Sequence, residues 1–352
     1  MASISHAIQT LVEAYSLMTS LPKRLVPTLV GSPGVGKSSA VYQAAERIAA
    51  ENGIAPEDFS VVEMRPVTMD PAEIAGFRIV VDGKTVVTEA DWFPQTKYGV
   101  LFLDEIGKSQ AAAVNALSEV MLDHRIGTRA LPPGWMVCAA TNRLSDRAGE
   151  ARLAAHIQDR MLTINVDLDP KGLQEYAIAN HWYDHVPIYF NYRPEFVHHL
   201  DADGKGGTPR SWEMVSNIKQ ADLSPDVEHT LTLAALGEEI HADWCAFERV
   251  IDRLPNIADL IADPEGASID HTPDITYALM GALATNMARD PSKASGVIRY
   301  LDRLDQEWAF TCMTDAERFS KALGEKGEKI KPLSSSKAYT DWLVKHKDVF
   351  IN

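Results

Sequence analysis

The chain has 352 residues, with 49 acidic and 34 basic side chains and a formal net charge of −15. Its length suits two or three domains, and 45% hydrophobic with 24% charged residues is typical of a globular protein rather than a disordered or fibrous one. No apolar run is long enough for a membrane span, and the acidic balance disfavours free nucleic acid as a partner. Three widely spaced cysteines suggest neither a disulfide framework nor a zinc site, and they favour a reducing cytoplasm.

The first half of the chain predicts strands that alternate with helices. We expect helices over 1–21, 37–50, 70–76 and 109–122, and strands over 25–30, 59–64, 100–104, 135–141 and 161–166. Such alternation indicates a parallel, doubly wound sheet of five strands. The pattern changes from about residue 170, where helices follow one another with turn-rich breaks.

Two insertions interrupt this alternation. Residues 78–90 read RIVVDGKTVVTEA, in which Asp82-Gly83 separates two β-branched runs and predicts a hairpin. Residues 127–133 predict a loop or a small second hairpin. We therefore expect an α/β core over 1–168 with insertions at about 77–92 and 126–134. Helices over the rest of the chain complete the predicted organisation.

Residues 31–38 read GSPGVGKS and fit the phosphate-binding pattern G-x-x-x-x-G-K-[ST] at every fixed position. A predicted strand precedes the motif and a predicted helix follows it, which is the context that this P-loop requires. Backbone N–H groups and the helix N-terminus would face the phosphates, while Lys37 reaches the β- and γ-phosphates and Ser38 holds Mg²⁺. The predicted nucleotide-binding residues are Gly31, Ser32, Pro33, Gly34, Val35, Gly36, Lys37, Ser38 and Ser39.

Two carboxylates and an amide follow later strands of the same predicted sheet. Residues 101–105 read LFLDE, which is typical of a Walker B element. Asp104 would then bind Mg²⁺ together with Ser38, and Glu105 would polarise the attacking water. Asn142 follows the strand over 135–141, where an amide can reach the γ-phosphate and that water. An acidic helix cap is the alternative for Asp104 and Glu105, and a turn at the end of the strand is the alternative for Asn142.

The stretch from Leu25 to Asp169 resembles the MoxR family of AAA+ ATPases. The matching segments read GSPGVGKS, RIVVDGKTVVTEADWFP, LFLDEIGKS, NALSEVMLDHRIG, TRALPPGW, VCAATN and EARLAAHIQDRMLTINV. The specific signature is the hairpin that interrupts the helix after the second strand, together with the insertion before the strand that leads to Asn142. The resemblance implies an AAA+ P-loop core with a helical lid over 169–224, followed by a helical C-terminal extension over 225–352. It also assigns Asn142 to the sensor 1 position.

The resemblance also assigns roles to two arginines. Arg160 matches the arginine finger, which contacts ATP bound by the neighbouring subunit, and Arg210 matches sensor 2 at the start of a lid helix. Arg147 and Arg152 are alternative fingers. Met161 replaces the family's phenylalanine, and the segment before Arg160 lacks its proline-rich pattern.

The function implied by the resemblance is ATP hydrolysis with Mg²⁺ at the subunit interfaces of a homo-oligomeric, hexameric ring. Relatives of this family remodel or mature a partner protein, which often carries a von Willebrand factor A domain. Three alternatives stay open: a nucleic-acid-acting AAA+ motor, a chelatase-type metal-insertion subunit and a nucleotide-switched assembly module without catalysis. The charge of −15 disfavours the first, and the complete set of catalytic residues disfavours the last.

Overall fold

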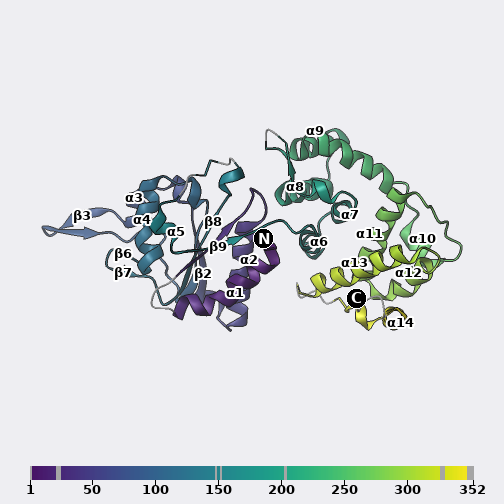
Figure 1. The fold of residues 1–352 in the computed structure, drawn as a ribbon, viewed down its shortest axis with the longest axis horizontal. Coiled ribbons are helices and arrows are strands. Elements are labelled where there is room, and N and C mark those ends of the chain that lie inside the picture. The colour runs from purple at the N-terminus through teal and green to yellow at the C-terminus, as the bar shows by residue number, and fades with distance from the viewer. Residues whose placement is uncertain are drawn as a thin grey trace. The chain divides into compact units, whose positions relative to one another are not determined.

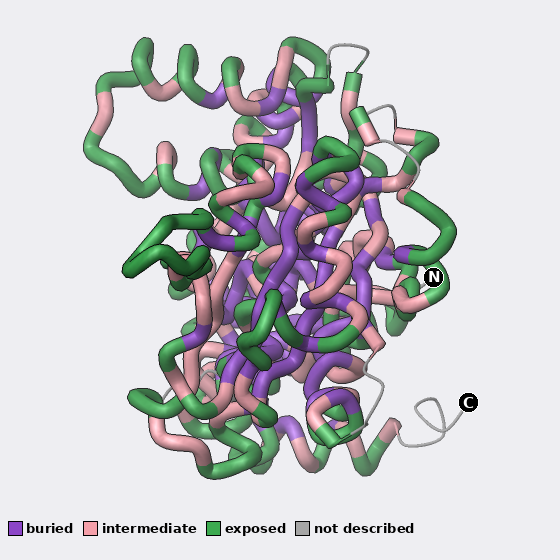
Figure 2. Tube along the Cα trace, turned by 90° about the vertical axis from the view of Figure 1, so that its left-hand side faces the viewer, coloured by how far each residue is buried: buried purple, intermediate pink, exposed green. Residues whose placement is uncertain are grey.

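The computed structural model of the chain describes residues 2–20, 25–146, 149–150, 153–201, 204–325 and 330–346. It divides into two compact units, residues 1–169 and residues 170–352 (Figure 1). Buried residues lie along the strands and on the inward faces of the helices (Figure 2). Among the described helices, none combines the length and the hydropathy that a bilayer span requires.

The first unit is built on a five-stranded sheet in the order β2-β5-β8-β1-β9. Its strands are β1 (Val26–Val30), β2 (Phe59–Met64), β5 (Tyr98–Leu103), β8 (Gly134–Thr141) and β9 (Met161–Asn165). All four strand pairings are parallel. The predicted parallel five-stranded sheet is therefore confirmed. Since all strands run in the same direction, their carboxyl ends meet at one edge.

Helices cover both faces of this sheet. Successive side chains of a strand point to opposite faces, and here the side chains on both faces are apolar. Val100 and Phe102 of β5 pack with α1 (Ile4–Ser20) and α2 (Lys37–Glu51) on one face. Leu101 and Leu103 pack on the other face. The helices on that face are α3 (Pro71–Ala75) and α4 (Ala111–Asp123), and the short helix α5 (Ala155–Gln158) also contributes to this core.

An antiparallel hairpin projects from this unit (Figure 1). It consists of β3 (Arg78–Val81) and β4 (Lys84–Val87), joined by Asp82 and Gly83, both of which have positive φ. Positive φ at both central residues matches the right-handed twist of a two-residue hairpin. All residues of both strands are exposed, although five of the eight are valine or isoleucine. A second, smaller hairpin pairs β6 (Arg125–Ile126) with β7 (Arg129–Ala130).

The second unit is mainly helical in its described part. Its helices are α6 (Pro170–Ala179), α7 (His185–Tyr192), α8 (Pro209–Gln220), α9 (Pro225–Ile251), α10 (Ile257–Ala262), α11 (Pro273–Arg289), α12 (Ala294–Leu301), α13 (Gln306–Glu325) and α14 (Lys337–Lys345). A short ladder pairs β10 (His199–Leu200) with β11 (Gly206–Gly207). Two apolar groupings organise these helices.

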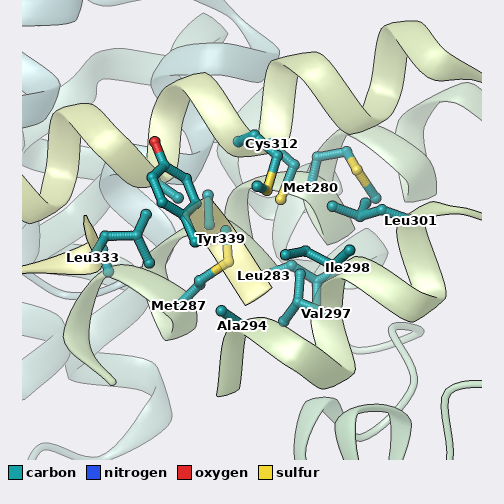
Figure 3. Packing of buried hydrophobic residues seen from close by; sticks show 14 of the residues in the cluster. Met280, Leu283, Met287, Ala294, Val297, Ile298, Leu301, Cys312, Leu333 and Tyr339 are labelled. Atoms are coloured by element: carbon teal, nitrogen blue, oxygen red, sulfur yellow. The ribbon is translucent and has the colours of Figure 1, made fainter. Parts of the chain in front are cut away.

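The larger grouping joins α11, α12, α13 and α14 around residues such as Leu283, Val297 and Tyr339 (Figure 3). In the smaller one, Tyr189 of α7 contacts Trp212 of α8 and Trp244 of α9 through ring pairs 4.9 and 5.3 Å apart. The predicted separation of a lid from an extension at residue 224 stays a prediction, and α8 and α9 pack together across that position.

Exposure predicts that the apolar side chains of the β3–β4 hairpin contribute little to folding. Val80 is 75% exposed, whereas Leu101 is fully buried. We expect Val80→Asp to change the free energy of unfolding by less than about 0.5 kcal/mol. The matched core variant Leu101→Ala should lose about 2–5 kcal/mol. Urea denaturation of both variants measures the difference, and an equally large loss in Val80→Asp would mean that the hairpin belongs to the core.

Candidate functional site

The loop over 31–36 connects β1 to α2, and its glycines allow the path that it takes. Gly36, directly before the helix, has a φ of 98°, in the left-handed region that a side chain disfavours. A Cβ atom on Gly31 would lie 2.5 Å from the backbone oxygen of Val166. The loop therefore needs glycine for its path at Gly36 and for close packing against the segment after β9 at Gly31.

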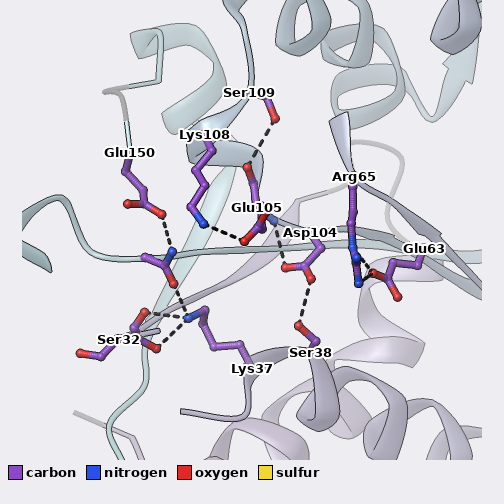
Figure 4. Close-up of polar contacts among 12 residues, drawn as sticks. Ser32, Lys37, Ser38, Glu63, Arg65, Asp104, Glu105, Lys108, Ser109 and Glu150 are labelled. Atoms are coloured by element: carbon purple, nitrogen blue, oxygen red, sulfur yellow. Dashed lines mark hydrogen bonds and ion pairs between the residues drawn. The ribbon is translucent and has the colours of Figure 1, made fainter. Parts of the chain in front are cut away.

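Lys37 begins α2, and its side chain is 8% exposed. Its Nζ donates to the backbone oxygens of Gly31 at 2.8 Å and Ser32 at 2.9 Å, and to Oδ1 of Asn142 at 2.8 Å (Figure 4). The ammonium group thus ties the loop to the end of β8. Burial lowers the pKa of Lys37 to about 8, and the surrounding carboxylates, of which Asp104 acts most strongly, oppose this shift.

Ser38 and Asp104 lie together at the end of β5. The Ser38 hydroxyl donates to Oδ2 of Asp104 at 3.0 Å, and Oδ1 of Asp104 accepts from the backbone N–H of Glu105 at 2.9 Å (Figure 4). A hydroxyl and a carboxylate beside a phosphate loop are ligands that Mg²⁺ takes together with water and phosphate oxygens. The donor set of this pair therefore fits the predicted Mg²⁺.

Glu105 leaves β5 in a left-handed conformation, with a φ of 54° and a ψ of 32°. This conformation costs a non-glycine residue about 1–2 kcal/mol, and such strain clusters at functional sites. Lys108, in the following 3₁₀ turn, donates to Oε1 of Glu105 at 2.7 Å (Figure 4). The Glu105 side chain is 40% exposed, so it is accessible while its carboxylate is paired.

Asn142 follows β8 and connects Lys37 to Glu150. Its Oδ1 accepts from Lys37, and its Nδ2 donates to Oε1 of Glu150. Three buried oxygens gather near this end of β8 without a hydrogen-bond partner among the described residues: Thr141 Oγ1, Asp146 Oδ2 and Glu150 Oε2. Buried polar atoms are normally paired, and exceptions are common at ligand sites.

Sequence reasoning missed Glu150, Asp146 and the Glu63–Arg65 pair. Glu150 begins the segment EARLAAHIQDRMLTINV, but the resemblance assigned it no role, and its contact with Asn142, eight positions earlier, appears only in the structure. Glu63 lies at the end of β2, where it accepts from Tyr42 Oη at 2.5 Å and pairs with Arg65 at 2.6 Å. The signal for Glu63 is its position near the carboxyl end of a parallel strand, which the sequence pattern could have indicated.

The predicted site residues thus fall into two groups. Lys37, Ser38, Asp104, Glu105 and Asn142 lie close together at the carboxyl edge of the sheet, beside the loop that carries the remaining P-loop residues. No described contact joins Arg160 to that cluster. Its guanidinium donates to the backbone oxygen of His156 at 2.6 Å, between α5 and β9.

The other predicted arginines lie elsewhere in the chain. Arg210 is exposed in the first turn of α8, in the second unit, where Thr208 caps the helix by accepting from the Ser211 backbone N–H at 3.1 Å. The alternative fingers Arg147 and Arg152 lie outside the described residues. The roles of all four arginines stay predictions.

Comparison with known proteins identifies the fold of the first unit. Residues 28–161 match the model of the AAA domain, dynein-related subfamily. Together with the five-stranded parallel sheet, this match confirms the predicted AAA+ P-loop core. No curated protein sequence matches the chain.

Several solved structures are similar at low identity. NtrX from Brucella abortus in complex with ADP is 14% identical, with 93% of this chain and 70% of that chain covered and a TM-score of 0.39. A putative ATPase from Cytophaga hutchinsonii is 16% identical, with coverages of 90% and 85% and a TM-score of 0.35. A point mutant of RuvB from Thermotoga maritima is 15% identical, with coverages of 98% and 91% and a TM-score of 0.33. At these TM-scores, none of the three adds to the argument.

The lowered pKa of Lys37 predicts that nucleotide binding depends on pH. The ammonium is present below about pH 8 and is lost as the pH rises through that value. If only the charged form binds phosphate, affinity for a nucleoside triphosphate should fall about tenfold between about pH 7 and pH 9. Titration calorimetry at several pH values measures this. The Lys37→Arg variant stays charged over this range, so any nucleotide affinity that it retains should not fall with rising pH. An affinity of the wild type that stays constant between these pH values would contradict the prediction.

Proposed function

We propose that this chain is an ATPase that hydrolyses ATP with Mg²⁺. The observation that carries the proposal is the contact of Lys37 Nζ with Asn142 Oδ1, beside that of Ser38 with Asp104. These contacts gather a phosphate-binding cation, a set of metal ligands and a polar amide at one edge of the sheet. Phosphoryl transfer needs positioned charge rather than a covalent intermediate, and this cluster supplies it.

The residues divide the work between binding and hydrolysis. The N–H groups of the loop over 31–36 and the start of α2 bind phosphate oxygens. Lys37 exchanges its backbone acceptors for the β- and γ-phosphates, and Ser38 with Asp104 holds the metal. When bound, Mg²⁺ neutralises charge that develops on the phosphate oxygens. Asn142 orients the γ-phosphate and the attacking water.

Glu105 polarises that water by accepting its hydrogen bond. Its carboxylate is paired with Lys108 in the structure, so it must be released before it can accept from water. Lys108 then remains, as a second cation, near the carboxyl edge of the sheet, where the phosphates bind. The pairing gives the site a resting arrangement in which the general base is occupied.

We further propose that hydrolysis takes place between subunits of a MoxR-like homo-oligomeric ring of six chains. Arg160 acts in the neighbouring subunit as a finger that stabilises transition-state charge, and Arg210 acts as sensor 2 from the helical unit. The separation of Arg160 from the Lys37 cluster supports action on a neighbour's nucleotide, since within one chain it contacts His156 instead.

The output of the ring is remodelling or maturation of a protein partner, one candidate being a protein with a von Willebrand factor A domain. The exposed apolar surface of the β3–β4 hairpin supports a protein partner, because an uncompensated apolar patch marks an interaction surface. The net charge of −15 points the same way, since nucleic acid would be repelled.

Two variants separate binding from hydrolysis. Lys37→Ala should abolish ATP binding because it removes the cation that faces the phosphates. Glu105→Gln should bind ATP with near-normal affinity and lose at least about a hundredfold in turnover, since the amide is a poor base. Phosphate release and calorimetry measure both, with Glu57→Gln, at an exposed carboxylate, as the matched control. Near-normal turnover in Glu105→Gln would remove the proposed base.

Mixing subunits tests the action of Arg160 on a neighbour. Arg160→Ala should bind ATP but lose about 10³-fold or more in hydrolysis, the range known for arginine fingers. Its own site keeps Lys37, so mixtures with Lys37→Ala subunits should regain part of the wild-type rate. Light scattering with ATP and Mg²⁺ reports assembly in the same samples. If the mixtures assemble normally but regain no hydrolysis, Arg160 acts on the nucleotide of its own chain and the proposal is wrong.

A further inference from the structure

Helix α9 is bent at Gly237, which has a φ of 75° and a ψ of 170°. These angles are far from helical values and interrupt the helix between its two halves. In a straight helix, His229 and His241 would be about 18 Å apart, given a rise of about 1.5 Å per residue. Their ring centroids are instead 4.6 Å apart. The bend therefore brings His229 of the first half of α9 beside His241 of the second half.

A third potential metal ligand lies beside this histidine pair. Cys245 follows His241 by one helical turn, and its Sγ is 3.5 Å from His241 Nε2. One ligand atom from each of His229, His241 and Cys245 lies within 4.8 Å of the other two. His241 and Cys245 are four positions apart and therefore lie on the same face of the helix. His229 lies beside them only because of the bend.

We propose that His229, His241 and Cys245 bind a Zn²⁺ ion, with a water molecule as the fourth ligand. Zn–N and Zn–S bonds of about 2.0 and 2.3 Å place the two donors about 3.5 Å apart in a tetrahedral site. The observed separation of 3.5 Å matches this value. Imidazole and thiolate donors favour zinc over Mg²⁺ or Ca²⁺, which prefer oxygen.

The protonation of these groups suits metal binding. His241 is buried, and burial together with the neighbouring His229 lowers its pKa, so its imidazole is neutral and offers a lone pair. Burial raises the pKa of the Cys245 thiol, so Zn²⁺ must displace the thiol proton as the Zn–S bond forms, releasing one H⁺ to solvent. His229 is exposed, which leaves the ion a path from solvent.

The neighbouring carboxylate has partners of its own. Glu248 pairs with Lys219 of α8 at 2.7 Å and faces His185 of α7 at 3.8 Å. These contacts leave Glu248 outside the ligand set and hold the second half of α9 against α7 and α8. A metal bound by the three ligands would then fasten the first half of α9 to this fixed part, across the bend at Gly237.

Cobalt titration of the full chain tests the site, because thiolate bound to Co²⁺ produces a sulfur-to-metal charge-transfer band. Excess Mg²⁺ keeps the oxygen ligands of Ser38 and Asp104 from contributing. We expect one Co²⁺ per chain with this band, and displacement by Zn²⁺. Cys245→Ser should lose the band, and both Cys245→Ser and His229→Ala should weaken Zn²⁺ binding at least about tenfold in competition with a chromophoric chelator.

The control variant is His271→Ala, at an exposed histidine elsewhere in the second unit, which should bind as the wild type does. Circular dichroism verifies that each variant is folded; His229 is exposed, so its replacement should not disturb packing. Zn²⁺ should also raise the melting temperature of the wild type and not that of Cys245→Ser. Absence of the band in the wild type, or its persistence in folded Cys245→Ser, would overturn the proposal.

Discussion

A buried ammonium group must find hydrogen-bond acceptors, and Lys37 finds them on two separate segments of the chain. Two are backbone oxygens of its own loop, and the third is the side chain of Asn142, 105 positions away. This charge holds the phosphate loop against the end of β8 and brings Asp104 and Glu150 into its field. In the proposed function, the phosphates of ATP would take over this cation, so the contacts that order the site are those that binding would exchange.

The parallel sheet makes this arrangement possible. Because every strand ends at the same edge, short polar segments after β1, β5 and β8 converge, although they are separated by whole helices in the chain. Glu105 adds a strained left-handed residue at that edge and is held by Lys108. The apolar residues that support this edge alternate between two helix-covered faces, and so the site rests on two cores rather than one.

The exposed hairpin and the bent helix α9 are features that folding stability alone does not require. The hairpin strands expose valine and isoleucine to solvent, which fits recognition of another protein. The bend in α9 has a non-helical backbone at Gly237, and it gathers two histidines and a cysteine. Each feature suggests a role beyond nucleotide chemistry, one in partner recognition and the other in metal binding.

Local patterns in the sequence were sufficient to predict the five parallel strands, the hairpin, the loop over 31–36 between a strand and a helix, and the position of Asp104 and Glu105 at a strand end. Each of these depends on short-range sterics or on hydrophobic periodicity. Glu150 could not be predicted in this way, since its contact with Asn142 follows neither helical nor strand spacing. The cluster of His229, His241 and Cys245 could not be predicted from the sequence for a similar reason. The widely spaced cysteines suggested no zinc site, and a straight helix would have kept the histidines far apart. Only the left-handed backbone at Gly237 brings them together, and tertiary packing decides that conformation.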